Sequence, residues 1–583
     1  MPNILTQLES RRRLQSALLL LAMACLPALP QTGPSVPSAA PPTATGLYRI
    51  AGTVVNAVTG EPVRRATVAA LAEADSHTVA SAVTDIDGSF ALEGLPAAKY
   101  QLSASRRGFR TAFYDEHDEF STAIVTGPGQ DTASLAFRLT PGSVLRGVVT
   151  GDGGDPVKDA EMMLFLKPHT HNPSDRIKQV ESTATDDTGA YEFGDLAAGE
   201  YLLAVKAKPW YALHRPVSES RPRPANDPSA TLDVAYPVTF FDSTTDEAAA
   251  SVIVLAGGNR EEANIALHAV PALHLTIEMP RRPDGSLASA ELRQSIFGAQ
   301  VSTERAGYSD SVRTGTAEFN ELRRGTAEFT GVAPGHYELA QGDPPRIVDL
   351  DATASQQVDL ALGTPTVAVS GTLQMPSGLL LTEESTMILD SLDPAHRQNP
   401  IQTTCTRGSF NFASVPPGAW ELSAAGSGSP LPIASITTGS RTRVGNQVTV
   451  RDHPLSLVVT VGLGETRVEG FASESGASGA PGDRSSSLGW HGVAGVMVVL
   501  APKNKSAWPA LIRRDQSDSD GSFSLRDVVP GQYIVVAIED AWALDWAQPE
   551  VLSRYLPGGI AVTVTEQSGK TLTLSRPVPV QTR

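Results

Sequence analysis

The chain has 583 residues, which is too many for one hydrophobic core, so we expect roughly three to six domains. Hydrophobic residues make up 41% of the chain, enough to fill several cores, which argues against wholesale disorder. The 50 Gly and 43 Pro favour a turn-rich, all-β protein. The net charge of −17 would repel a phosphate backbone and argues against nucleic acid as a partner.

The N-terminus has the pattern of an export signal. Arg11–Arg13 is basic, Ser16–Leu26 is apolar, and Pro27 ends the apolar run. About a dozen apolar residues are too few to span a bilayer, which takes ~20. We therefore predict a signal peptide over residues 1–30 and an exported protein that is periplasmic, cell-surface or extracellular. Residues 31–46, rich in Pro, Ser and Ala, predict a flexible tether. No later apolar run is long enough to cross a membrane.

The two cysteines, Cys25 and Cys405, cannot form a disulfide in a mature chain that has lost Cys25. The domains must then be held together by packing alone, unlike many secreted domains. Cys25 follows Leu21–Ala24, a loose match to a bacterial lipobox, with Ala22 where Leu or Val is usual. A lipid anchor on Cys25 therefore stays an alternative. Cys405 has no nearby His in the sequence and is predicted to be inert.

A short phrase returns five times along the chain. It consists of a turn with Gly, two apolar residues two positions apart, a second turn and an aromatic residue. Gly supplies the positive φ of a tight hairpin turn, and the apolar pair faces one side of a strand. An internal repeat of this kind decides the architecture before any single residue is interpreted. The copies are Gly88–Tyr100, Gly189–Tyr201, Gly325–Tyr337, Gly408–Trp420 and Gly521–Tyr533.

Alternating strands precede and follow the phrase in each unit. Period-2 alternation bounded by Gly, Pro and Asp is the strand and hairpin signal. Opening strands are predicted at Tyr48–Val55, Ser143–Val149, Val367–Leu373 and Thr466–Phe471. Closing strands are predicted at Leu135–Leu139, Asn264–Leu267, Val358–Leu362, Leu455–Val459 and Thr571–Leu574.

Short strands with turns at regular spacing indicate a β-sandwich. We therefore predict an all-β fold, a tandem array of about five immunoglobulin-like or transthyretin-like β-sandwich modules after the signal peptide. The predicted modules are 47–140, 141–270, 271–363, 364–462 and 463–583, of which the third and fourth are divergent.

Three units carry a Thr-Asp or Ser-Asp entry before the phrase, in Thr84–Phe90, Thr185–Tyr191 and Ser519–Phe523. With the Gly-x-Val opening strand and the aromatic after the second turn, this pattern resembles the carboxypeptidase regulatory-like domain. The resemblance implies a transthyretin-like, seven-stranded sandwich akin to the Cna B-type and starch-binding-like folds. Units three and four keep the aromatic hairpin but lack the entry. Because that family is a non-catalytic accessory domain, the resemblance is specific for fold and almost silent on function.

Motifs for catalysis are absent from the sequence. None of the 11 histidines is followed by Glu at the third position, as a zinc carboxypeptidase requires. His-Glu-x-x-His, Gly-x-Ser-x-Gly and the phosphate-cradling Gly-x-x-x-x-Gly-Lys-Ser/Thr are absent as well. The sequence therefore predicts no enzyme and no cofactor.

Two patterns suggest a metal but have simpler explanations. His169 and His171 could share an ion, yet a zinc site needs a third or fourth ligand. The Asp-x-Asp-Gly sequences that begin at Asp85 and Asp518 lack the spaced ligands and the final Glu of a calcium loop. A β-turn capped by Asp explains these sequences with fewer assumptions than a calcium site, so no metal site is predicted.

Aromatic residues recur after the aromatic strand of units one, two and five. The first of each group follows Tyr100, Tyr201 or Tyr533 by nine positions. Aromatics in such loops can stack on sugar rings or bind a partner loop, whereas the structural alternative is an arm that packs back over its own sheet. Recurrence at one offset favours the structural role. The candidate ligand-binding aromatics are Phe109, Tyr114, Trp210, Tyr211, Trp542 and Trp546.

These observations favour a non-catalytic, exported binding module of the cell envelope or extracellular space. Glycan is the leading ligand class, and an envelope protein is the other candidate partner. The alternative is a structural spacer or protein-interaction scaffold, and a less favoured one is an accessory part of a peptidase. Exposed, coplanar pairs at Trp210/Tyr211 or Trp542/Trp546 would favour glycan binding, and burial of all four would favour the scaffold.

Overall fold

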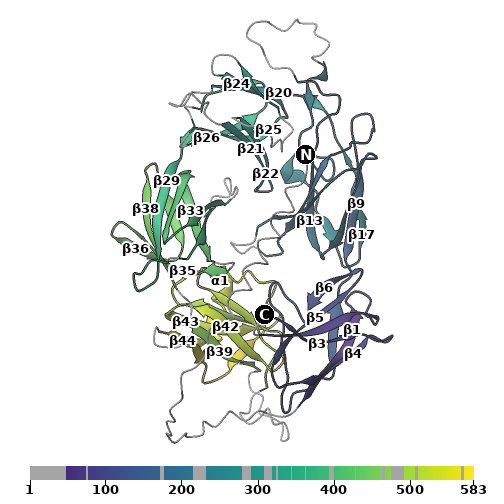
Figure 1. Cartoon of the computed structure of the whole chain (residues 1–583), viewed down its shortest axis with the longest axis vertical. Coiled ribbons are helices and arrows are strands. Elements are labelled where there is room, and N and C mark those ends of the chain that lie inside the picture. The colour runs from purple at the N-terminus through teal and green to yellow at the C-terminus, as the bar shows by residue number, and fades with distance from the viewer. Residues whose placement is uncertain are drawn as a thin grey trace, which may run out of the picture. The chain divides into compact units, whose positions relative to one another are not determined.

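The computed structural model describes residues 47–583 except for fourteen gaps and two single positions, and Cys25, the predicted signal peptide and the tether lie outside it. The gaps are 74–75, 171–175, 215–230, 279–289, 307–317, 323–325, 343–344, 361–362, 382, 393–399, 427–428, 463–465, 475–490, 506–507, 509 and 566–569. The described chain is almost entirely β-structure (Figure 1).

The first sandwich has a sheet of order β4-β1-β8 and a second sheet of order β3-β2-β5-β6, with β7 also paired to β5. Phe90, Leu92 and Phe137 are buried between the sheets. Its strands are β1 (Tyr48–Asn56), β2 (Thr67–Ala72), β3 (Thr78–Val83), β4 (Ser89–Leu95), β5 (Lys99–Arg106), β6 (Phe109–Phe113), β7 (Ile124–Val125) and β8 (Leu135–Leu139).

The second sandwich pairs the sheet β12-β9-β17, with β18 also on β9, against β11-β10-β13-β15, with β16 also on β13. A two-stranded sheet, β14-β19, follows at its far end. Its elements are β9 (Ser143–Thr150), β10 (Glu161–Lys167), β11 (Lys178–Ala184), β12 (Ala190–Leu196), β13 (Gly199–Lys206), β14 (Val234–Ala235), β15 (Thr239–Phe240), a 3-10 turn (Glu247–Ala249), β16 (Ile253–Leu255), β17 (Arg260–Glu262), β18 (Ile265–Ala266) and β19 (Val270–Pro271).

The third sandwich has sheets of order β23-β24-β20-β27 and β22-β21-β25-β26-β28. Leu275, Phe329 and Leu339 are fully buried in its core. Its strands are β20 (Leu273–Glu278), β21 (Ala290–Ile296), β22 (Ala299–Ala306), β23 (Glu318–Leu322), β24 (Thr326–Val332), β25 (Gly335–Gly342), β26 (Pro345–Ala352), β27 (Gln356–Val358) and β28 (Thr364–Pro365).

The fourth sandwich has sheets of order β32-β29-β38-β35-β36 and β31-β30-β33-β34, with β37 also on β33. Its core includes Phe412, Leu422 and the free thiol of Cys405. Its strands are β29 (Val367–Gln374), β30 (Ser385–Ser391), β31 (Ile401–Cys405), β32 (Ser409–Val415), β33 (Gly418–Gly426), β34 (Ser429–Leu431), β35 (Ile433–Thr438), β36 (Arg441–Val444), β37 (Gln447–Val450) and β38 (Leu455–Val461).

In the fifth sandwich a continuous path of strand pairs, β41-β40-β43-β46-β39-β42, joins the two layers, with β44 on β43 and β45 on β39. Phe523, Leu525 and Tyr533 lie in its core. Its elements are β39 (Thr466–Ser473), β40 (Met497–Pro502), β41 (Arg513–Gln516), β42 (Ser522–Val528), β43 (Gly531–Ile538), α1 (Pro549–Leu552), a 3-10 turn (Leu556–Gly558), β44 (Ile560–Val564), β45 (Thr571–Thr573) and β46 (Val578–Gln581).

All five sandwiches share one pairing pattern around their first strand. That strand runs antiparallel to the strand of the phrase, as β1 does to β4, and parallel to a closing strand, as β1 does to β8. The same two pairings recur at β20 in the third sandwich and at β29 in the fourth. The predicted tandem array of five β-sandwiches is therefore confirmed, and the divergent third and fourth copies keep its central strand pairing.

The Gly of the phrase is required by the close approach of two strands. Gly88 and Gly189 both have φ near +75°. A Cβ on either would stand 2.5 Å from a backbone oxygen of the opening strand, that of Val54 or Val149. Only Gly adopts this conformation at such a distance without strain, which explains why the phrase begins with it.

The predicted hairpin is wrong, because the two strands that the phrase joins, such as β4 and β5, pair with other strands and not with each other. The aromatic of the phrase closes the turn between them in all five copies. Its ring is buried, and its polar tip donates a hydrogen bond to the backbone oxygen four residues earlier. Tyr201 bonds Ala197 in this way at 2.9 Å, and in the fourth sandwich the Trp420 indole bonds Pro416 at 3.1 Å. Tyr100, Tyr337 and Tyr533 do the same. Each such bond contributes about 1 kcal/mol and fixes the turn between two strands.

The Thr-Asp entry has a separate role. The buried Thr84 hydroxyl accepts from the amide of Ala66 at 2.8 Å and donates to the oxygen of Val63 at 2.7 Å. Thr185 makes the same pair of bonds in the second sandwich. In the fifth sandwich Ser517 makes them, not the predicted Ser519, which bonds Val125 of the first sandwich. The hydroxyl therefore satisfies backbone groups where the second strand begins, in the three copies that match the pattern best.

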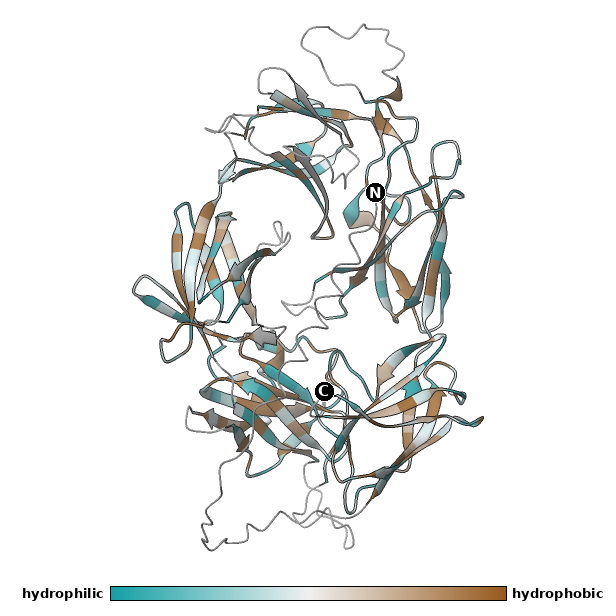
Figure 2. Cartoon of the chain, viewed as in Figure 1, coloured by the Kyte–Doolittle hydropathy of each residue, from teal (hydrophilic) through white to brown (hydrophobic). Residues whose placement is uncertain are grey.

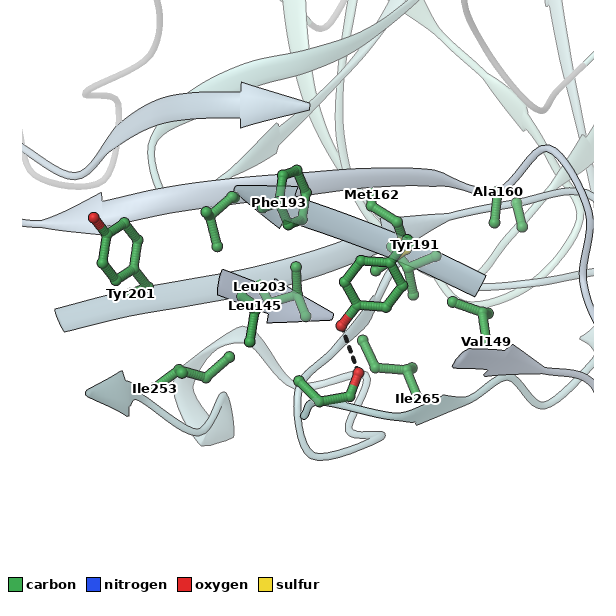
Figure 3. Close-up of a cluster of buried hydrophobic side chains, with 14 of the residues drawn as sticks. Leu145, Val149, Ala160, Met162, Tyr191, Phe193, Tyr201, Leu203, Ile253 and Ile265 are labelled. Carbon is green, nitrogen blue, oxygen red and sulfur yellow. Dashed lines mark hydrogen bonds between the residues drawn. The ribbon is translucent and has the colours of Figure 1, made fainter. Parts of the chain in front are cut away.

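Hydrophobic and hydrophilic residues follow one another along the strands, as the brown and teal segments of Figure 2 show. In the second sandwich the buried side chains include Leu145, Phe193 and Leu203 (Figure 3). The Tyr191 hydroxyl donates to the oxygen of Ala263 at 2.5 Å, the dashed line in Figure 3, and burial raises the pKa of this phenol. Full burial of a side chain such as Phe193 contributes about 1.5–3 kcal/mol.

Candidate functional site

The predicted aromatics of the first sandwich pack against its own core. Phe109 is half-buried on β6, and the Arg106 guanidinium lies 5.2 Å from its ring centre. Tyr114 stands edge-on to the core ring of Phe137, with centroids 5.7 Å apart. Burial raises the pKa of the Tyr114 hydroxyl. Both rings therefore cover the sheet rather than form an open platform.

The second sandwich differs, because one of its two predicted aromatics projects into solvent. Trp210 is 88% exposed. Tyr211 is half-buried, and the two rings stand perpendicular at 87° with centroids 5.8 Å apart. Burial, with the Tyr211 hydroxyl nearby, raises the pKa of Tyr236 to about 12. The pair therefore presents a single exposed indole rather than a coplanar surface.

The segment that follows β13 covers the outer face of the sheet that contains β10 and β13. Val238 and Phe240 join Met163 and Phe165 in a second hydrophobic cluster outside the main core. The fifth sandwich has an equivalent cluster on the outer face of β40 and β43, where Leu552 of α1 packs. Because apolar residues occupy both faces of these sheets, the arms have a structural role there.

Trp542 of the fifth sandwich is half-buried and lies against residues of the first. Its ring stacks on His117, with centroids 5.0 Å apart and planes 8° from parallel. Phe120 lies 5.8 Å away on a tilted plane. The indole N–H donates to the oxygen of Gly495 at 3.3 Å. Offset aromatic pairs of this kind contribute about 0.5–1.5 kcal/mol beyond their burial.

Trp546 is joined to the same surface through Arg514. The guanidinium carbon lies 4.3 Å from the Trp546 ring centre and 5.1 Å from that of Phe120. Arg514 also bonds the carboxylate of Asp118 at 3.2 Å. One cation is thus held between an aromatic ring from each sandwich and an acid from the first.

Gln516 is the buried polar centre of this contact. Its amide nitrogen donates to the hydroxyl of Thr122 at 2.7 Å and to the backbone oxygen of Asp115 at 2.5 Å. Its oxygen lies 3.3 Å from a ring nitrogen of His117. Gln516 is 1% exposed and Thr122 2% exposed, so these bonds are made out of contact with water. Buried polar groups with satisfied bonds specify one arrangement of the surfaces that carry them.

Asp518 adds a charge pair and a stretch of backbone bonding. Its carboxylate bonds the Lys99 ammonium at 2.5 Å and accepts from the amide of Ala123 at 3.2 Å. Burial opposes the charged ammonium, but Asp518 outweighs that effect and raises the pKa of Lys99. Burial raises the pKa of Asp518, against the pull of Lys99. Ser519 exchanges bonds with the same segment, to Ala123 and Val125.

We call this set the 1–5 contact. Its members are Lys99, Asp115, His117, Asp118, Phe120, Thr122, Ala123 and Val125 of the first sandwich and Arg514, Gln516, Asp518, Ser519, Trp542 and Trp546 of the fifth. The sequence pointed to the two tryptophans. It gave no signal for residues 115–125, whose polar character is that of an ordinary loop.

The other residues examined in the sequence have plain roles. Asp87 and Asp520 each accept from the amide two residues on, as turn caps do. Cys405 is buried, and burial raises the pKa of its thiol. The structure describes His169, whereas His171 lies in the gap at residues 171–175. Across the described residues, no group of three or more His, Cys, Asp or Glu side chains is placed to hold a metal ion.

Comparisons with protein families match two parts of the chain. Residues 49–140, in the first sandwich, match the family model of the carboxypeptidase regulatory-like domain. Residues 482–554, in the fifth sandwich, match the model of the second β-sandwich domain of a NOMO1-like subunit of the BOS complex. The family resemblance predicted from the sequence is confirmed by these matches.

A comparison with curated proteins found no match. Among solved structures, the chain is similar to the Bacillus anthracis TIE protein, at 11% identity over 72% of this chain and 75% of that one, with a TM-score of 0.15. It is also similar to two B repeat units of the collagen-binding protein Cna of Staphylococcus aureus, at 9% identity over 71% and 99%, with a TM-score of 0.12. At these scores neither match carries an argument about function. No helix in the described part of the chain has the length and apolar character to cross a membrane.

Proposed function

We propose that the protein is a non-catalytic, exported array of β-sandwiches that serves as a binding module of the cell envelope or extracellular space. The exposed indole of Trp210 carries this proposal, and the 1–5 contact illustrates how such side chains bind a protein surface within the chain. At the ends of the first and fifth sandwiches, aromatic and polar side chains already bind a protein surface through stacking, a shared cation and a buried amide. Such an arrangement suits recognition and support rather than chemical turnover.

Carbohydrate is the finer ligand class that we propose, and it rests on Trp210. An indole that is 88% exposed costs hydrophobic free energy in water, and stacking on a sugar ring would recover it. Trp542 and Trp546 are weaker candidates, because His117 and Arg514 already cover their rings. Phe109, Tyr114 and Tyr211 are half-buried and serve at most as flanks of such a site.

The test is retention of the mature chain on immobilised polysaccharides and on cell-envelope fractions. Trp210→Ala is expected to abolish retention on the glycan that the chain binds. The matched control is Ile86→Ala, because Ile86 is 81% exposed in a different sandwich and has no aromatic ring. If the mature chain is retained on no glycan, or if Trp210→Ala binds as the unaltered chain does, carbohydrate binding through this residue is refuted.

The alternative function is a structural spacer or protein-interaction scaffold, and the use of Trp542 in the 1–5 contact favours it. In that case envelope proteins, and not polysaccharides, would be retained by the chain. A role as an accessory part of a peptidase rests only on the match of residues 49–140 to a regulatory-like domain. That role would require a catalytic partner to copurify with the chain.

Export and the module boundaries are part of the same proposal. We propose that residues 1–30 are removed, that residues 31–46 tether the array, and that lipid on Cys25 is the alternative N-terminus. Intact mass measurement of the protein from its native host distinguishes cleavage near residue 30 from a lipid-modified Cys25. The proposed module limits of 140/141, 270/271, 363/364 and 462/463 predict that mild proteolysis cuts near these positions first.

A further inference from the structure

Four buried ionisable side chains meet where the second sandwich gives way to the third. His214 and Asp233 belong to the segments before β14, His274 lies on β20, and Glu328 lies on the neighbouring strand β24. The side chains are exposed by 1%, 7%, 9% and 0% respectively. Ionisable groups are almost never buried so completely unless they are paired.

The four groups form a chain of short contacts. His214 Nδ1 lies 3.0 Å from one oxygen of Asp233, and His274 Nε2 lies 2.8 Å from the other. His274 Nδ1 lies 2.7 Å from Glu328. His274 therefore stands between two carboxylates, one from each sandwich, with both of its ring nitrogens engaged.

With Asp233 and Glu328 both ionised, this geometry requires His274 to carry a positive charge. An ionised carboxylate only accepts hydrogen bonds, and both ring nitrogens can donate only when the ring is an imidazolium. A neutral imidazole at His274 would set a nitrogen lone pair against a carboxylate oxygen at one of the two contacts. The carboxylates of Asp233 and Glu328 therefore hold a proton on His274.

Apolar contacts also support this junction. Phe297 of the third sandwich stands edge-on to Phe165 and Phe240 of the second, with ring centroids 5.2 and 5.1 Å apart. Three alanines, Ala235, Ala272 and Ala333, form a smaller hydrophobic cluster between the two sandwiches. The backbone adds the short β14–β19 pairing and a bond from the amide of Ala272 to the oxygen of Asp233 at 2.9 Å. The charged cluster is the buried ionisable part of this junction, beside these apolar and backbone contacts.

We propose that the protonated His274 ring, held between Asp233 of the second sandwich and Glu328 of the third, is a proton-dependent lock on the junction of these two sandwiches. Loss of the proton leaves two buried carboxylates facing a neutral ring, and the junction opens. The cluster thereby makes the connection between the second and third sandwiches sensitive to pH, which is the pH outside the cell if the protein is exported as proposed.

The charged groups that face His274 come from both sides. Asp233 and Glu328 are the charges that act on its ring, and His214 lies on the far side of Asp233. The backbone amide of His274 donates to the Ser355 hydroxyl at 2.9 Å, which fixes the strand. Gly331 adjoins the His214 ring, because a Cβ there would stand 2.6 Å from it.

The direction of the pH dependence follows from the same contacts. The hydrogen bond to Glu328 raises the pKa of His274 above 6.5, burial opposes this, and Asp233 reinforces it. A pKa that is raised in the folded state stabilises the fold fully below the unfolded value, and that stabilisation is lost as the pH rises through the folded value. The proton on His274 therefore stabilises the junction below the unfolded pKa of the ring, and this stabilisation is lost as the pH rises through the raised pKa of the folded state.

The test uses hydrogen exchange of the full chain from about pH 6 to about pH 10, with each rate divided by the intrinsic rate at that pH. Protection of peptides that cover β14, β19 and β20 is expected to fall at least about tenfold as His274 loses its proton. Glu328→Gln keeps a hydrogen-bonding group but removes one charge, so the midpoint of that fall is expected about one pH unit lower or more.

His336→Asn is the matched control, because His336 also lies in the third sandwich and pairs with Asp351 at 2.8 Å, but in solvent. It is expected to leave the midpoint unchanged. Should Glu328→Gln fail to fold, Asp233→Asn is the second variant and should move the midpoint the same way. A constant protection across the pH range, or an unmoved midpoint in a folded variant, would overturn the lock.

Discussion

Gln516→Ala should separate the first sandwich from the fifth. The substitution removes the short hydrogen bonds to the Thr122 hydroxyl and the Asp115 backbone oxygen, and the longer contact with the His117 ring, at a site that is 1% exposed. A typical bond contributes about 0.5–1.5 kcal/mol, and a buried group left without its partner costs about 1–3 kcal/mol. Because Thr122 can still donate to Asp115 at 2.9 Å, we expect a total loss of about 2–3 kcal/mol.

That loss corresponds to a shift of about 30- to 150-fold in the docking equilibrium. The amides of Ala123, Val125 and Ser519 report docking directly, because each is bonded across the 1–5 contact. Hydrogen-exchange mass spectrometry of the full chain should show their protection fall by about that factor. Peptides of the third sandwich should be unaffected, because they lie outside the contact.

Gln532→Ala is the matched control, since Gln532 lies on β43 of the same sandwich with its side chain exposed. It should leave the protection of all three amides unchanged. Gln516→Glu keeps the size of the side chain but replaces the donor with an acceptor, and should weaken docking at least as much as Gln516→Ala. If both Gln516 variants fold and keep full protection at Ala123 and Val125, the buried amide does not hold the contact.

Three further substitutions test the physical account of the fold and the contact. Gly189→Ala should destabilise the second sandwich by about 2 kcal/mol or more in urea unfolding, because its φ is +75° and the new Cβ would meet the Val149 oxygen. Gly194→Ala is the control and should not destabilise it, because Gly194 lies in open space on β12, the strand that follows Gly189. Tyr201→Phe removes the turn-closing bond to Ala197 and should cost about 1 kcal/mol in the same assay. Burial, opposed by the bond from the Ser524 amide, raises the pKa of Asp515 from 3.8 to about 7, so the stability of the fifth sandwich should fall by up to about 4 kcal/mol between pH 4 and pH 8. Asp515→Asn should flatten that dependence, and a variant as pH-dependent as the original would disprove this account of Asp515.

The aromatic arms show where sequence reasoning reached its limit. The offset of nine residues found the right segments, and the structural alternative of an arm packed over its own sheet describes Phe109 and Tyr114 well. The sequence could not separate Trp210 from Trp542, because both are tryptophans at the same offset. One is 88% exposed and the other stacks on a histidine from a distant module. Which of the two is covered depends on contacts between residues more than 400 positions apart.

The cluster of buried charges around His274 could not be predicted from the sequence for a similar reason. His274 and Glu328 are separated by 54 positions, and each stands on a strand with ordinary alternation. Neither belongs to a motif, and no spacing rule joins them to Asp233 in the preceding module. The sequence showed the alternation of the strands but not that both faces of β24 are buried.

The five-fold phrase is what the sequence determined by itself. Its apolar pair and its aromatic stand within some 13 residues, and the aromatic bonds the backbone four residues earlier, so short-range bonding fixes the turn wherever the phrase occurs. Its Gly, in contrast, is required by a strand that lies more than 30 positions away. Only the tertiary structure decided how the modules meet, at Gln516 and Trp542 on one side and at His274 on another. The reason is physical: a turn is specified by neighbours in the chain, whereas a buried polar contact is specified by two surfaces that the chain brings together only after both have folded.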